Sequence, residues 1–250
     1  MERITSRANP LCAHIRKLNG SKAYRRASGE FVCEGPKLTA EALRWGAGVT
    51  AVVSAPDRPL DCPGGARRVE VPADLLQSLC DTQTPQGVLC LCRTPDTALP
   101  ERLPGGRYLV LDGVQDPGNV GTVWRTADAF GADGLILLPG CADPWSPKTV
   151  RATMGACFRL PVYETDLAAL KARLDGADLP LYATALRHDT EDLRSVRLDR
   201  CAVVIGSEGR GVGEETLALC EKTLKIPMRE RCESLNAAVA AAVVLWEMIR

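Results

Sequence analysis

The feature that most constrains this fold is an alternation of apolar strands and helical segments that begins at residue 107. Short apolar runs at 108–111 and 135–138 predict strands, and the apolar spacing of 120–130, closed by Gly131, predicts a helix between them. Further strands are predicted at 181–184, 201–205 and 223–226, and a last helix at about 234–249. Because parallel strands need helical crossovers, the pattern predicts an α/β fold whose parallel sheet carries helices on both faces.

Residues 1–95 predict a separate, smaller α/β domain. After a basic helical opening, strands are predicted at 31–35, 49–54, 69–71 and 87–92, and helices at 37–45 and 73–79. Residues 96–106 have turn-forming prolines and glycines and little apolar periodicity, which is typical of a linker. We therefore expect one domain at 1–95, a linker at 96–106 and a second domain at 107–250.

The charge of the chain is balanced overall but not locally. The formal net charge is zero, yet residues 1–28 hold seven basic side chains and one acidic side chain, a local net charge of +6. The basic residues are Arg3, Arg7, Arg16, Lys17, Lys22, Arg25 and Arg26. Such a cluster suits phosphate contacts, although a solvated helix face would have the same composition. The aromatic content of 4% argues against a surface that reads single-stranded bases by stacking.

The cysteines indicate neither a zinc site nor a disulfide framework. The chain has eleven, scattered without a Cys-x-x-Cys pair, and only two histidines, His14 and His188. The N-terminus lacks the apolar core of a signal peptide, and the longest apolar run, 237–246, is too short to cross a bilayer. We therefore expect no metal, no membrane segment, and a cytoplasmic protein with reduced thiols.

Three loops, each after a predicted strand, hold the candidate functional residues, and the first of them spans 111–121. Asn119 has the position of a helix N-cap in this loop. Arg125 follows on the helix, which also displays Val120, Val123 and Phe130 and is therefore expected to pack against the core. A guanidinium on the buried side of such a helix would need an anionic partner.

The second loop, 203–211, ends an apolar strand in three glycines interrupted by Glu208. Its spacing, Gly-x-x-Gly-x-Gly, is not the dinucleotide-binding fingerprint, and alone it is compatible with a simple turn. The third loop runs from Ile226 through Ser234, Leu235 and Asn236 into an alanine-rich helix. Either Ser234 or Asn236 would serve as a plain N-cap.

Taken together, in this order and spacing, the three loops resemble the three motifs of the SpoU-type RNA ribose 2′-O-methyltransferases of the SPOUT superfamily. The resemblance covers residues 107–250. Residues 1–95 are similar to the L30e-like substrate-binding domain that many members have, through 4–10, Glu34-Gly35 and 84–88.

The resemblance implies a trefoil knot in the C-terminal domain, an exception to unknotted topology, which would form the site for S-adenosylmethionine. The cofactor-binding residues implied are Gly206, Ile226, Leu235 and Thr184. The catalytic residues implied are Arg125, Asn119, Glu208, Ser234 and Asn236. The implied reaction is methyl transfer to a ribose 2′-hydroxyl of RNA, which requires withdrawal of the hydroxyl proton and in-line alignment with the methyl group.

The role of Arg125 has two interpretations. The family's candidate base is this arginine, but a guanidinium is protonated at neutral pH and donates hydrogen bonds without accepting them. The alternative is that Arg125 binds the neighbouring phosphate and stabilises the developing alkoxide, while Ser234 and Asn236 position the ribose. The third motif also departs from the family pattern, because Glu230 stands where a glycine is usual.

The resemblance further implies a homodimer through the knot region and ribosomal RNA as the substrate. Two alternatives are a transfer RNA methyltransferase and a catalytically silent RNA-binding relative, although all five functional side-chain types are present. A nicotinamide-dependent oxidoreductase is disfavoured, because no glycine fingerprint follows the first strand of the α/β domain.

Overall fold

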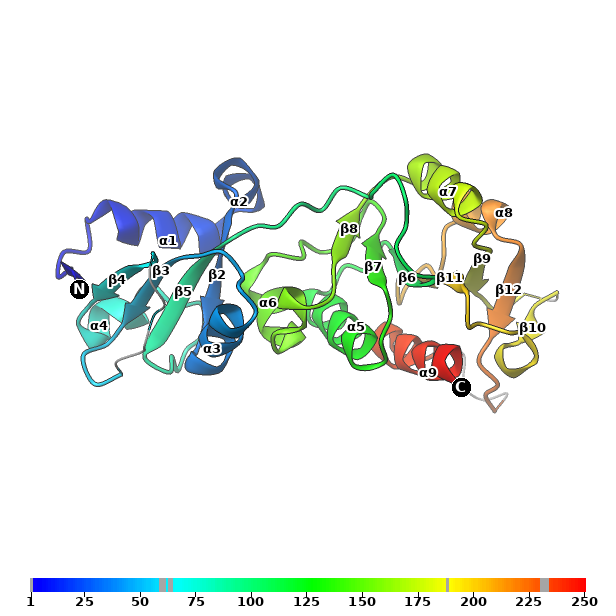
Figure 1. Cartoon of the computed structure of the whole chain (residues 1–250). Helices are drawn as coiled ribbons and strands as arrows, with labels where there is room; N and C mark the ends of the chain where they lie inside the picture. Colours follow the sequence, from blue (N-terminus) through cyan, green and yellow to red (C-terminus); the bar gives the residue numbers. More distant parts are fainter. Residues whose placement is uncertain (1, 59–61, 63–64, 188, 230–233) are drawn as a thin grey trace. The chain divides into compact units, whose positions relative to one another are not determined.

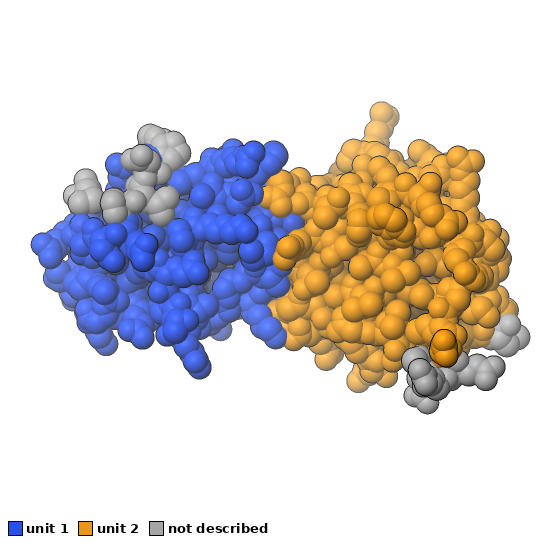
Figure 2. Space-filling model, turned by 90° about the horizontal axis from the view of Figure 1, so that it is seen from below, with its two compact units in different colours: residues 1–95, 145–158 blue, residues 96–144, 159–250 orange. Residues whose placement is uncertain are grey.

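The computed structural model of the chain describes residues 2–58, 62, 65–187, 189–229 and 234–250. These residues form two compact units, each built around a β-sheet of its own (Figure 1). Unit 1 consists of residues 1–95 and 145–158, and unit 2 consists of residues 96–144 and 159–250 (Figure 2). Unit 1 thus includes an insertion, 145–158, that comes from the middle of unit 2 in the sequence. The functional domain boundaries expected from the sequence stay a prediction.

Unit 1 contains a mixed sheet with the strand order β1-β4-β3-β5-β2. The strands are β1 (Glu2–Arg3), β2 (Glu30–Glu34), β3 (Val49–Ser54), β4 (Arg67–Glu70) and β5 (Val88–Arg93). Strands β1, β4 and β3 pair in parallel, whereas β5 pairs antiparallel with both β3 and β2.

Helices cover both faces of this sheet. They are α1 (Pro10–Gly20), α2 (Lys22–Ser28), α3 (Pro36–Arg44), α4 (Ala73–Gln77) and α6 (Pro147–Thr153), the last followed by the 3-10 turn η1 (Ala156–Phe158). Ile15 of α1 and Leu75 of α4 share one core with Val32 and Leu91 of the sheet. Side chains alternate between faces along a strand, so Phe31 lies on the opposite face, where its ring packs against that of Trp145 at 4.6 Å.

The basic residues of the N-terminal cluster differ in their exposure to solvent. Most of its side chains are exposed on α1, α2 and the preceding residues, but Arg25 is buried. Its guanidinium donates hydrogen bonds to the carbonyls of Leu18 and Asn19, where α1 ends. Arg25 therefore caps a helix and is not available to phosphate, which corrects the interpretation of the whole cluster as one surface.

Unit 2 contains a sheet with the order β10-β12-β9-β11-β6-β7-β8, in which every pairing is parallel. The strands are β6 (Arg107–Asp112), β7 (Gly134–Leu137), β8 (Val162–Glu164), β9 (Leu181–Thr184), β10 (Glu191–Asp192), β11 (Cys201–Gly206) and β12 (Lys222–Lys225). The predicted parallel sheet is confirmed. The sequence pattern missed β8 and β10, which are short.

The helices of unit 2 are α5 (Pro117–Ala129), α7 (Leu167–Gly176), α8 (Glu214–Leu219) and α9 (Ala237–Ile249), and a 3-10 turn, η2 (Leu193–Ser195), follows β10. Helices α7 and α8 lie on one face of the sheet, and α5 and α9 lie side by side on the other (Figure 1). Leu170 and Leu174 of α7 share a core with Tyr108, Val110 and Val204 of the central strands. Among the described residues, none forms a helix long and apolar enough to span a membrane.

The strand order reverses at β6, which has β7 on one side and β11 on the other. In open parallel sheets, ligands bind beyond the carboxyl ends of the strands near such a reversal. Gly206 ends β11 in register with Asp112, the last residue of β6, and Thr184 ends β9 in register with Leu224 of β12. The three predicted functional loops therefore start from the same edge of the sheet. The expected trefoil knot stays a prediction.

Candidate active site

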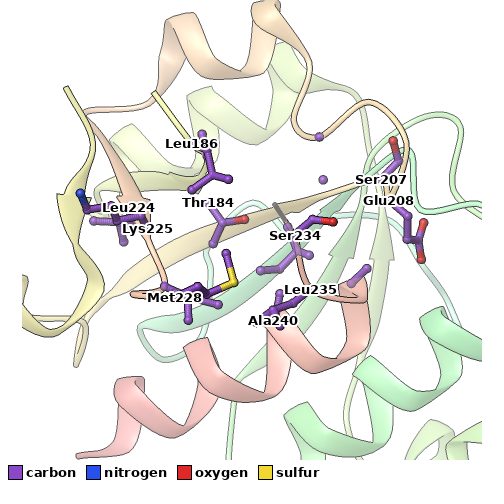
Figure 3. Close-up of a pocket in the computed structure, with 16 residues that line it drawn as sticks. Thr184, Leu186, Ser207, Glu208, Leu224, Lys225, Met228, Ser234, Leu235 and Ala240 are labelled. Atoms are coloured by element: carbon purple, nitrogen blue, oxygen red, sulfur yellow. The ribbon is translucent and has the colours of Figure 1, made fainter. Parts of the chain in front are cut away.

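A pocket of about 270 Å³ opens at the carboxyl ends of β9, β11 and β12. Its walls come from the segments after these strands and from the first turn of α9 (Figure 3). The lining residues are Thr184, Ala185, Leu186, Ile205, Gly206, Ser207, Glu208, Gly211, Leu224, Lys225, Ile226, Met228, Ser234, Leu235, Ala237 and Ala240. All four residues predicted to bind the cofactor are among them, which places them around one cavity.

Polar side chains lie at both ends of the pocket and between them (Figure 3). Ser207 and Glu208 lie at the opposite end of the pocket from Leu224 and Lys225, and Ser234 lies between these ends (Figure 3). Most of the remaining lining is aliphatic. An apolar cavity with a few placed polar groups is typical of a small-molecule or cofactor site.

The glycines after β11 are explained by a tight fold-back of the chain. Ser207 and Gly211 exchange two backbone hydrogen bonds, at 2.9 and 3.0 Å, so the loop closes on itself immediately after the strand. Gly206 lies directly beneath this closure, and a Cβ atom there would be 2.1 Å from the carbonyl carbon of Gly211. Gly211 itself has a φ of +68°, a conformation that side chains disfavour. The loop therefore requires glycine at both positions.

The first loop corrects the expected role of Asn119. The N-cap of α5 is Asp116, whose carboxylate accepts a hydrogen bond from the backbone N–H of Asn119 at 2.9 Å. The helix begins at Pro117, three residues earlier than the sequence predicted, because proline fits the first helical position. Asn119 thus lies in the first turn, and its side chain is not used as a cap.

Asn236, in the third loop, is the N-cap of α9. The Asn236 Oδ1 atom accepts hydrogen bonds from the backbone N–H groups of Ala238, at 2.9 Å, and Val239, at 3.3 Å. Its Nδ2 atom donates to Oδ1 of Asn119 at 3.2 Å. Asn236 therefore begins the helix and, with the other end of the same amide, joins the third loop to the first.

The second loop joins the same network through Glu208. The Nδ2 atom of Asn119 donates a hydrogen bond to the Glu208 carboxylate. The Asn119 amide thus accepts from Asn236 and donates to Glu208, so one side chain from each loop forms a continuous chain of hydrogen bonds. Asn119 is thus brought into contact with Glu208, 89 positions later in the sequence, and with Asn236, 117 positions later.

The position of Arg125 differs from the sequence expectation. The buried face of α5 consists of Val120, Val123, Trp124 and Ala127, and Trp124 is fixed by a hydrogen bond to the carbonyl of Leu160 at 3.0 Å. Arg125 is exposed on the other side of the helix and is not among the residues that line the pocket. The expectation of a guanidinium on the packed side was wrong, because the residue falls one step outside the apolar stripe.

Sequence reasoning missed one residue that positions the second loop. Asp112 ends β6, and its carboxylate accepts hydrogen bonds from the Gly213 N–H at 2.9 Å and the Thr216 hydroxyl at 2.8 Å. These bonds fix the start of α8, directly after the glycine loop. A carboxylate directly after the strand predicted at 108–111 was the available signal.

Thr184 links two neighbouring strands, and Glu230 is not among the residues that the structure describes. The Thr184 hydroxyl donates a hydrogen bond to the carbonyl of Val204 at 3.0 Å, so this side chain also ties β9 to β11 at the edge of the pocket. Glu230, the departure from the family pattern, lies outside the described residues.

The pocket fits the expected cofactor, S-adenosylmethionine. Its volume is close to that of the smallest cofactor sites, about 300 Å³, and its lining combines aliphatic side chains with Thr184, Ser207 and Ser234. The absence of a Cβ at Gly206 lets the loop close over the strand end, so that backbone groups border the cavity. Backbone hydrogen-bonding groups next to an apolar wall suit a nucleoside with a charged tail.

Comparisons with known families match both parts of the chain. Residues 106–246 match the SpoU rRNA Methylase family, and residues 9–90 match the MRM3-like substrate binding domain. The chain is 32% identical over 252 residues to the 23S rRNA (guanosine(2553)-2′-O)-methyltransferase RlmP of Bacillus subtilis, covering 99% of both chains. It is 29% identical to the human mitochondrial rRNA methyltransferase 3, covering 91% of this chain and 69% of that one.

Solved structures match over almost the full length. The AdoMet-bound rRNA methyltransferase from Sinorhizobium meliloti superimposes with a TM-score of 0.87 at 31% identity, covering 99% of this chain and 97% of that one. The SpoU methyltransferase AviRb from Streptomyces viridochromogenes, in complex with AdoMet, has a TM-score of 0.87 at 28% identity, covering 97% of each chain.

Proposed function

The chain belongs to the SpoU rRNA methylase family, and from this premise we propose that it transfers a methyl group from S-adenosylmethionine to a ribose 2′-hydroxyl of ribosomal RNA. The observation that carries the proposal is that the second and third loops line one pocket, and that Asn119 of the first loop is joined to them by hydrogen bonds with Glu208 and Asn236. Relatives named as ribosomal RNA 2′-O-methyltransferases support the same reaction.

Each group of residues has a proposed task. Gly206, Ile226, Leu235 and Thr184 hold the cofactor, which supplies an electrophilic methyl group on a positively charged sulfur. Ser234 and Asn236 orient the ribose, and Asn119 and Glu208 hold Asn236 in place through the hydrogen-bonded chain. Because Arg125 is exposed, it is better placed to bind an RNA phosphate and stabilise a developing alkoxide than to act as a buried base.

The proposed reaction is tested by incubating the purified chain with S-adenosylmethionine labelled in the methyl group and total RNA from a strain that lacks the protein. We expect label in ribosomal RNA. Label confined to transfer RNA would support the transfer RNA alternative, and cofactor binding without label in any RNA would support the catalytically silent one. Either result would contradict the proposal.

Asn236→Asp should separate helix capping from catalysis. Aspartate caps a helix as well as asparagine does, so the thermal unfolding temperature is expected to stay close to that of the wild type. Aspartate cannot donate the hydrogen bond that Asn236 gives to Asn119, and we expect methyl transfer to fall by about 10-fold, the effect of about 1.4 kcal/mol. Unchanged initial rates in the variant would remove Asn236 from the proposed positioning role.

Unit 1 is proposed to bind the RNA through its basic N-terminal helices. Lys17 on α1 and Lys22 on α2 are exposed, and the Lys17 ammonium group lies over the ring of Tyr24 at 5.4 Å. Replacing both lysines with alanine should weaken RNA binding and reduce the slope of log K against log salt by about 0.7 to 0.9 for each phosphate that the variant no longer neutralises. Filter binding at several salt concentrations measures the slope, with Lys171→Ala of α7 as the control. An unaltered slope would contradict this assignment.

We also propose a homodimer that uses α9. Val239, Val243, Trp246 and Ile249 are exposed by 37% to 57% and form one stripe along this otherwise buried helix. Trp246 also packs against Phe130 of α5, with ring centroids 5.8 Å apart. The stripe is an apolar surface of the kind that homodimers bury.

We propose a cytoplasmic location for the protein, because cysteines without paired spacing are typical of a reducing compartment.

Trp246→Glu should dissociate the proposed dimer, because a charge would be buried in an apolar interface. Light scattering after size exclusion is expected to give twice the chain mass of 26.9 kDa for the wild type and the single chain mass for the variant. Trp45→Glu, at an exposed tryptophan of unit 1, is the control and should stay dimeric. A monomeric wild type, or a dimeric Trp246→Glu variant, would exclude this interface.

A further inference from the structure

Unit 1 contains a cluster of three buried cysteine thiols that plays no part in the proposed reaction. Cys33 lies on β2, and Cys90 and Cys92 lie on the neighbouring strand β5. All three residues have no measurable exposure to solvent. Cys33 and Cys90 are direct partners in the antiparallel register of the two strands, so pairing of the strands brings together cysteines 57 to 59 positions apart in sequence.

The three sulfur atoms converge more closely than the backbone requires. Cys90 and Cys92 are two residues apart on one strand, where the Cα atoms are about 6.6 to 6.8 Å apart. Their Sγ atoms are only 3.8 Å apart, and the Sγ atoms of Cys33 and Cys92 are also 3.8 Å apart. All three Sγ atoms lie within 4.8 Å of one another. The side chains therefore lean toward a common point.

This spacing matches the geometry of a zinc thiolate. A zinc–sulfur bond is about 2.3 Å long, and tetrahedral geometry then places the sulfur atoms about 3.8 Å apart. We infer that Cys33, Cys90 and Cys92 bind one thiophilic metal ion, for which zinc fits best. Thiolates are soft ligands, and this preference excludes hard ions such as Mg²⁺ and Ca²⁺.

The insertion 145–158 packs on the sheet face that carries the cluster. The face of the sheet that carries the three cysteines is the face that carries Phe31, against which Trp145 of the insertion packs. Cys157, in η1 of the insertion, is also buried, but its sulfur is not part of the group whose atoms all lie within 4.8 Å of one another. The three strand cysteines are therefore the protein ligands of the proposed site.

Metal binding at the cluster is an exchange of protons for a metal ion. Binding of Zn²⁺ replaces the thiol protons with metal–sulfur bonds, and each coordinated cysteine releases one proton to solvent. No electron transfer is involved, so the cysteines need no oxidant.

The test measures metal in the full chain, expressed and purified under reducing conditions without chelator. Elemental mass spectrometry is expected to find about one zinc ion per chain. Replacing zinc by Co²⁺ should produce the sulfur-to-cobalt charge-transfer band and the intense visible bands of tetrahedral cobalt, which report sulfur ligands directly.

Two variants locate the site. Cys92→Ala removes the sulfur shared by both 3.8 Å contacts and should lose the metal. Cys12→Ala, at a buried cysteine in the core on the opposite sheet face, should keep it. Circular dichroism checks the fold of each variant. If Cys92→Ala does not fold, the cobalt spectrum of the wild type still shows whether cysteine thiolates bind the metal ion. A wild type without zinc and without cobalt–thiolate bands, full metal retention in Cys92→Ala, or a disulfide within the cluster would overturn the inference.

Discussion

Gly206→Ala is expected to weaken S-adenosylmethionine binding by about 10- to 100-fold, the effect of about 1.4 to 3 kcal/mol of overpacking. The added Cβ would lie 2.1 Å from the carbonyl carbon of Gly211 and 2.2 Å from the backbone nitrogen of Val212. These are backbone atoms, which cannot rotate away as a side chain can. The glycine loop would have to separate from the end of β11, and the wall of the pocket would move with it. Isothermal titration calorimetry measures the change in affinity.

Gly209→Ala is the matched control within the same loop. A Cβ at Gly209 would have no neighbouring heavy atom within 4 Å, so cofactor affinity should be close to that of the wild type. The thermal unfolding of both variants shows whether the fold persists. Equal affinities of Gly206→Ala and the wild type would mean that the loop after β11 does not form the cofactor site.

Arg125→Ala is expected to reduce kcat by about 100- to 1000-fold, the loss typical when one donor to a developing oxyanion is removed. Arg125 is exposed and does not line the pocket, so the affinity for S-adenosylmethionine should be unchanged. Arg125→Lys keeps the positive charge but loses the forked geometry that binds phosphate through two hydrogen bonds. We therefore expect it to recover only part of the rate, in single-turnover assays with saturating RNA.

Arg102→Ala provides the control for a general loss of positive charge, because Arg102 is an exposed arginine of unit 2 outside the three loops. Its turnover should stay close to that of the wild type. Near-normal turnover in Arg125→Ala or Arg125→Lys would argue against a specific role of the guanidinium. A loss of cofactor binding in Arg125→Ala equal to the loss of rate would show that the arginine acts on the pocket.

The sheet of the second unit was predictable because its central strands are buried on both faces and read as continuous apolar runs. β6, β7, β9 and β11 have this property. β8 and β10 have three and two residues, too few for a periodic pattern, and α7 has charged residues on much of its surface. The insertion 145–158 could not be assigned to unit 1 from sequence, because its partners lie more than fifty residues earlier.

Of the candidate site, the sequence predicted the three loops but not the contacts that join them. Asn119 and Asp116 are both good capping residues, and only the start of α5 at Pro117 decides between them. The exposure of Arg125 follows from its place next to the apolar stripe of the same helix, which includes Trp124. The convergence of Cys33 with Cys90 and Cys92 depends on strand pairing across a long stretch of chain, which the spacing of cysteines does not reveal.

The identity of the methylated atom tests the central claim most directly. After incubation with S-adenosylmethionine, the ribosomal RNA is digested to nucleosides, and the added methyl group is located by tandem mass spectrometry. We predict that it is found on the sugar, at the 2′-oxygen of a single nucleotide. A methyl group on the base would contradict the proposed reaction.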